Sequence, residues 1–159
     1  MINDQEFLHG AAFLRVINYG NKVTITHISW IHPSLYLVET DISKSGILFK
    51  LSKKPKSAWS FTFSAQEQSA LISLHNKYPE SSVFIALICH IDGICCLSEE
   101  QLLSVLEESA GISGQRVSVS RRLNGSYHVN GSSRRSLERT VPQSNWPRVV
   151  LLKDTSCYE

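Results

Sequence analysis

Several features that define large protein classes are absent from this chain of 159 residues. No apolar run approaches the roughly 20 residues that span a bilayer, so we expect no membrane-spanning helix. The N-terminal residues Met-Ile-Asn-Asp-Gln-Glu contain neither the basic nor the apolar stretch of a secretory signal. Cysteines number only four, and three of them lie in apolar segments: Cys89, Cys95 and Cys96. Buried thiols in a reducing cytoplasm therefore fit better than a disulfide framework.

The motifs of several common enzyme classes are missing too. There is no Gly-x-Ser-x-Gly for a serine nucleophile, and no Walker-type or dinucleotide-binding glycine motif. The six histidines show no spacing suited to zinc. In the nearest cluster, Cys89-His90 with Cys95-Cys96, neighbouring side chains on a strand point to opposite faces. We therefore favour core cysteines over a zinc site.

The composition, with 42% apolar and 19% charged residues, is that of a globular domain, but the charge is segregated. Residues 112–149 contain seven arginines and one acid, and residues 40–66 contain five lysines and one acid. Residues 67–111, between them, contain seven acids and one lysine. Two basic segments favour a polyanionic partner, although solvated loops would have the same composition.

Periodicity and turn signals predict an alternation of helices and strands. The expected helices cover about 4–19, 64–78 and 98–111. The expected strands cover about 23–31, 35–41, 47–52, 60–63, 83–89, 94–97, 117–122, 126–129 and 149–152. The order is α-β-β-β-α-β-β-α followed by a basic hairpin, which indicates an α/β (α+β) domain with a central mixed sheet flanked by helices. Residues 1–111 would form the core, with 112–159 as a hairpin and extension packed on the same domain.

Local signals support several of these boundaries. Ser64-Ala-Gln-Glu67 and Ser98-Glu-Glu-Gln101 are capping boxes that begin helices, and Asn124-Gly125 is a strong hairpin signal. In the first helix we expect an apolar stripe at helical spacing, formed by Phe7, Ala11, Leu14 and Ile17. Gly10 costs that helix about 1 kcal/mol, which close packing on the sheet would explain.

Acidic residues and a lysine lie on neighbouring expected strands. Glu39 and Asp41 are two positions apart, so a strand would point both carboxylates to one face. Lys50 lies in the apolar run of the next strand. Two acids and a lysine that converge there could hold a divalent metal against a phosphate.

Several stretches between about residues 4 and 108 resemble the PD-(D/E)XK nuclease superfamily, the restriction-endonuclease-like fold, and within it Holliday-junction resolvases and Mrr-like enzymes. Residues 7–20 resemble the opening helix and residues 23–26 the first strand of that fold. Gly46-Ile-Leu-Phe-Lys50 resembles the strand that bears the motif lysine, and residues 83–94 resemble the late strand and hairpin.

The resemblance implies a magnesium-dependent hydrolysis of DNA. Asp41, or Glu39, matches the first metal-binding acid, and Lys50 matches the lysine that orients water. Leu48 stands where the family has its second acid. Either Glu39 and Asp41 would together supply both carboxylates, or Glu67 would act as a migrated acid, although Glu67 already has a role in its capping box.

Two basic stretches are candidates for nucleic-acid contact. Lys53, Lys54 and Lys56 could hold a phosphate backbone while Trp59 or Phe61 stacks on a base, but we favour burial of both aromatic rings in the core.

Arg121 and Arg122 lie near the tip of the second candidate, the expected hairpin. They could bind phosphates or enter a groove, or simply keep an edge hairpin soluble.

Three functions follow from this sequence. The first is a DNA-engaging protein of restriction-endonuclease-like fold that acts as a phosphodiesterase. The second is a catalytically inactive relative, a binding or regulatory subunit that contacts nucleic acid or protein. The third is an interaction module that uses the acidic residues 67–111. The resemblance also allows a homodimer or a larger protein complex, and we expect a cytoplasmic location.

Overall fold

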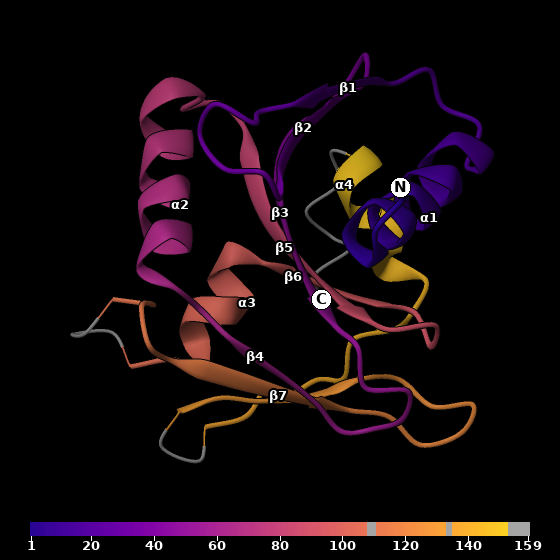
Figure 1. Ribbon diagram of the computed structural model, residues 1–159, viewed down its shortest axis with the longest axis vertical. Coiled ribbons are helices and arrows are strands. Elements are labelled where there is room, and N and C mark those ends of the chain that lie inside the picture. Colours follow the sequence, from indigo (N-terminus) through magenta and orange to yellow (C-terminus); the bar gives the residue numbers. More distant parts are fainter. Residues whose placement is uncertain (108–110, 133–134, 153–159) are drawn as a thin grey trace.

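The computed structural model describes residues 1–107, 111–132 and 135–152 (Figure 1). Its helices are α1 (Asp4–Asn18), α2 (Ala65–Lys77), α3 (Glu99–Ser104) and α4 (Asn145–Leu151). Its strands are β1 (Thr24–His27), β2 (Leu35–Glu39), β3 (Lys44–Ser52), β4 (Trp59–Thr62), β5 (Ser82–Cys89), β6 (Ile94–Ser98), β7 (Arg116–Ser120) and β8 (His128–Asn130). The mixed α/β (α+β) class expected from the sequence is confirmed.

The strands form two sheets. The larger one has the order β1-β2-β3-β5-β6, and the smaller one has the order β4-β7-β8. β1, β2 and β3 are an antiparallel meander, and the crossover through α2 makes β5 parallel to β3. β5 is the apolar run expected to be a central strand, and it is buried on both faces from Val83 to Cys89.

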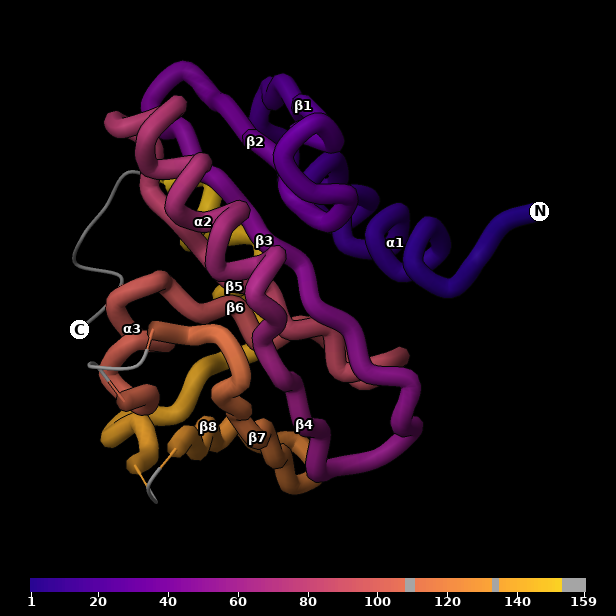
Figure 2. The backbone as a smooth tube through the Cα atoms, turned by 60° about the vertical axis from the view of Figure 1, so that its left-hand side comes forward, coloured from indigo at the N-terminus to yellow at the C-terminus, as the bar shows by residue number. Residues whose placement is uncertain are grey.

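Three layers follow from these faces (Figures 1 and 2). One side of the large sheet packs against α1 and α4, where Ala12 and Val16 share a core with Phe49 and Phe84. The other side packs against α2, α3 and the small sheet, in a core that includes Leu48, Leu74 and Val119. Trp59 and Phe61 lie in this second core, so the prediction that both rings are buried is confirmed.

Helix starts agree closely with the capping signals, because a cap is satisfied within four residues. Asn3 accepts a hydrogen bond from the amide of Glu6 at 2.8 Å. The Ser64–Glu67 and Ser98–Gln101 boxes form both of their hydrogen bonds. The end of the third helix was predicted too late: α3 ends at Ser104, whereas the prediction extended it to 111, and residues 108–110 lie outside the described part.

The expected edge strand at 149–152 is wrong, because these residues belong largely to α4. Periodicity cannot separate a strand from a buried helical turn in so short an apolar run. Pro147, whose ring fixes φ near the helical value, precedes the run. The indole nitrogen of Trp146 donates to the carbonyl of Ala12 at 3.1 Å and fastens α4 to α1.

The apolar stripe predicted on α1 faces away from the sheet. Phe7, Leu14 and Ile17 are 68%, 55% and 60% exposed. The sheet is covered instead by the opposite face of the helix, formed by Leu8, His9, Ala12 and Val16. Because α1 has apolar residues on both faces, spacing alone did not identify the buried one. The close packing expected at Gly10 is also wrong, since no described atom beyond its chain neighbours and the nearby backbone of α1 lies within 4 Å of the position its Cβ would occupy.

Candidate nucleic-acid interface

Lys50 and Glu67 meet where β3, β4 and α2 come together. The Lys50 ammonium donates to Glu67 Oε1 at 2.8 Å and to the carbonyl of Thr62 at 2.6 Å. The same Glu67 oxygen accepts the Ser64 amide at 2.8 Å and so completes the capping box. The two side chains are only 15% and 9% exposed. Of the acids predicted to lie beside Lys50, the structure places Glu67 there.

Glu39 and Asp41 lie at the other end of the meander. Glu39 pairs with Lys44, the first residue of β3, and Lys50 is six positions further along the same strand. At 3.3 Å per residue the separation is about 20 Å. Asp41 is exposed in the turn between β2 and β3. The structure therefore does not bring Glu39 or Asp41 to Lys50, because the short turn sets the register that separates them.

The predicted metal ligands accordingly do not converge. Within the described ranges, no group of three His, Cys, Asp or Glu side chains could hold a metal ion. Leu48, at the position of the family's second acid, pairs with Leu35 and is completely buried. Magnesium binds through one or two carboxylates plus waters and phosphate. Near Lys50 the structure offers a single carboxylate, that of Glu67, and its Oε1 already accepts two hydrogen bonds.

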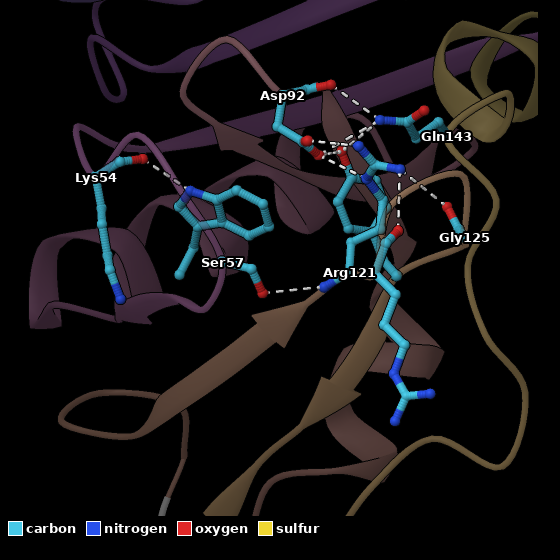
Figure 3. A network of polar contacts seen from close by, with 9 residues as sticks. Lys54, Ser57, Asp92, Arg121, Gly125 and Gln143 are labelled. Atoms are coloured by element: carbon cyan, nitrogen blue, oxygen red, sulfur yellow. Dashed lines mark hydrogen bonds and ion pairs between the residues drawn. The ribbon is translucent and has the colours of Figure 1, made fainter.

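The two basic stretches, 65 residues apart in the chain, lie side by side. β4 pairs with β7 so that Trp59 is opposite Val119, which places the β3–β4 loop beside the β7–β8 loop. The amide of Arg121 donates to Ser57 Oγ at 3.1 Å across this junction (Figure 3). An open cavity of about 610 Å³ lies here. We call it the basic groove; its lining residues are Ser57, Ser120, Arg121, Arg122, His128 and Asn130.

The guanidinium of Arg121 is partly buried and is held by hydrogen bonds within the protein. It donates to both carboxylate oxygens of Asp92, at 2.8 and 2.6 Å (Figure 3). Tyr127 donates to the same carboxylate at 3.0 Å, and the side-chain amide of Gln143 donates to the Asp92 carbonyl at 2.9 Å. The Arg121 hydrogen bonds hold the pKa of Asp92 below its usual value. Arg121 therefore ties the β5–β6 turn to the small sheet, and its charge is compensated.

Other cations at the basic groove and on its neighbouring loop are less committed. Lys54 donates to the carbonyl of Ala58 at 2.9 Å, and Lys53 lies 3.6 Å from the exposed Asp4. Lys56 and Arg122 are exposed. Among the described residues, Lys54, Lys56 and Arg122 take part in no ion pair. The positive charges of these three side chains could therefore pair with phosphate groups.

Sequence reasoning missed the contacts that organise this region. Asp92 lies in the turn that joins β5 to β6. Its side-chain partners Arg121, Tyr127 and Gln143 lie 29, 35 and 51 positions away. No local spacing could signal such a cluster. Ser57, His128 and Asn130 were missed for the same reason.

Comparison of the chain with protein-family models, curated proteins and solved structures finds no match. In the described part of the chain, no helix is both long and apolar enough to span a bilayer.

Proposed function

We propose that this protein binds the phosphate backbone of DNA at the basic groove and does not itself cut it. The observation that carries the proposal is the pairing of β4 with β7, which joins the lysine-rich loop 53–56 to the arginine-bearing hairpin. Lysine and arginine contacts to phosphates supply most of the affinity of DNA-binding proteins. A fold that joins two separate basic stretches into one surface concentrates that attraction.

The lining of the basic groove suits phosphate contact. The uncompensated charge of Arg122 lies beside the polar groups of Ser57, His128 and Asn130. Hydroxyl, imidazole and amide groups donate to phosphate oxygens and position a protein along the backbone without reading bases. Trp59 and Phe61, the aromatic rings that could have stacked on bases, are buried. Binding with little sequence preference follows from this composition.

Binding without cutting is favoured because the acids do not converge. Hydrolysis by the metal-dependent route needs carboxylates that hold the ion beside the lysine. Glu39 and Asp41 are at the far end of β3, and Lys50 is engaged by Glu67 and Thr62. Lys50 therefore serves the junction of β3, β4 and α2 in this proposal.

Fluorescence anisotropy with a labelled DNA duplex at several salt concentrations tests the binding. The variant Lys56→Ala/Arg122→Ala should bind about tenfold more weakly, and the slope of log K against log salt should fall by about 2, since each lost phosphate contact contributes about 0.9. The matched control Lys22→Ala/Lys77→Ala removes the same charge elsewhere on the surface. Equal weakening in both variants, or no binding at low salt, would overturn the proposal.

A second assay addresses the nuclease alternative. Supercoiled and branched DNA are incubated with the protein and magnesium or manganese, beside a Lys50→Ala variant. We expect bound DNA that stays intact with either metal. Metal-dependent cutting that disappears in the variant would reinstate the phosphodiesterase hypothesis.

A further inference from the structure

The outward side of α1 is an uncovered apolar surface. We call the set formed by Phe7, Gly10, Ala11, Leu14 and Ile17 the α1 outer face. Its three large side chains are more than half exposed, and Gly10 and Ala11 are exposed between them. Single exposed apolar residues are ordinary, but a contiguous stripe on one helix marks an interaction surface.

Gly10 gives a second reason to expect a partner here. Glycine inside a helix costs about 1 kcal/mol relative to alanine. No packing contact in the described part of the chain offsets this cost, because no atom beyond its chain neighbours and the nearby backbone of α1 lies within 4 Å of the position its Cβ would take. Small residues at the centre of a helix face let a second helix approach closely, with large side chains packing on either side. Gly10 and Ala11 occupy that central position between Phe7 and Leu14.

We propose that the α1 outer face forms a symmetric homodimer in which α1 packs antiparallel against α1 of a second copy. A two-fold axis that passes between residues 10 and 11 places Phe7 opposite Leu14 of the second copy, and Gly10 opposite Ala11. Each contact then occurs twice, as in every isologous interface. Phe7, Gly10, Ala11 and Leu14 are arranged symmetrically about this centre, whereas the position of Ile17 is related to that of Asp4.

The charges beside this face complement each other in the same arrangement. Asp4 and Arg15 are eleven residues apart, close to three helical turns, so they lie on the same flank of α1 at opposite ends. The antiparallel pairing brings Asp4 of each copy near Arg15 of the other. A parallel pairing would instead place Asp4 and Arg15 of the two copies on opposite flanks, so neither ion pair would form.

The size of the contact sets the expected affinity. A helix of 15 residues is about 22 Å long and roughly 10 Å across. A pair in contact along this length buries on the order of 1,000 Å² in total, near the lower limit for specific interfaces. We therefore expect a reversible dimer with Kd in the micromolar range. The dimer does not depend on the proposed DNA binding, since α1 contributes no residue to the basic groove.

Sedimentation velocity between about 1 and 200 µM tests the interface. The wild-type protein should pass from monomer to dimer across this range. Leu14→Glu should remain monomeric, and circular dichroism should show an unchanged fold because the side chain is exposed. The matched control is Ile72→Glu, which changes an isoleucine that is 54% exposed on α2, and it should dimerise as the wild type does.

Charge reversal tests the antiparallel register. Asp4→Arg should weaken the dimer about tenfold, and Asp4→Arg/Arg15→Asp should restore it because both intermolecular pairs reform with opposite sign. A wild-type monomer at 200 µM, or dimerisation of Leu14→Glu at the wild-type concentration, would overturn the interface. Failure of the double reversal to restore the dimer would overturn the register.

Discussion

Replacing Lys50 by methionine removes an ammonium group from a nearly buried ion pair while keeping most of the side-chain volume. The side chains of Lys50 and Glu67 are only 15% and 9% exposed. The substitution leaves the Glu67 carboxylate with the Ser64 amide as a donor. It also removes the hydrogen bond to Thr62, which links β3 to the end of β4.

The expected cost follows from what each variant leaves behind. Removing one partner of a buried pair costs about 3–5 kcal/mol, and the remaining donor places Lys50→Met near 3 kcal/mol. Glu67→Gln should cost about 1–2 kcal/mol, because glutamine still serves the capping box and Lys50 retains Thr62. The double variant should cost about 2–3 kcal/mol, less than the sum, since neither charge is then stranded.

Urea unfolding, followed by tryptophan fluorescence, measures all four proteins of this cycle. Lys56→Met is the matched control: its lysine is exposed, and the free energy of unfolding should change by less than about 0.5 kcal/mol. A Lys50→Met protein as stable as the wild type would refute the structural role of Lys50. So would strict additivity in the double variant.

Two further predictions concern other buried polar groups. Burial, and secondarily the charge of His27, lowers the pKa of His9 from 6.5 to about 4, so His9 takes up a proton in the unfolded chain at a higher pH than in the folded protein. The free energy of unfolding should therefore fall as the pH drops from about 6.5 to 4. His9→Gln should flatten this loss in urea titrations at several pH values. Asp92→Asn should reduce the free energy of unfolding by about 1–2 kcal/mol, because it removes the charge that pairs with Arg121 while the guanidinium keeps the carbonyls of Arg122 and Gly125 as acceptors. A melting temperature within 1 °C of the wild type would contradict this.

Local signals in the sequence predicted most of the elements correctly. The boxes at Ser64 and Ser98 identify their helices because donor and acceptor are three residues apart. The apolar run 83–89 identifies a central strand because both of its faces are buried. Asn124 adopts a φ of 62° in the turn that asparagine and glycine favour. These features need no knowledge of the rest of the chain.

The candidate site depends on register and on distant contacts, which the sequence does not display. A single turn after Glu39 decides that this acid faces Lys44 and not Lys50. The acid that contacts Lys50 is Glu67, whose role in the capping box already accounts for its presence in the sequence. Composition identifies the two basic stretches, but their proximity in the fold depends on the pairing of β4 with β7.

That pairing has a consequence for how the protein is made. Trp59 finds its main-chain neighbour in Val119, so about 60 further residues must leave the ribosome before β4 can join a sheet. Until then β4 has unpaired main-chain groups, and its aromatic rings do not have the small sheet to pack in. Synthesis stopped at position 111 would yield a fragment prone to self-association, because the small sheet is complete only after residues 116–130 have emerged.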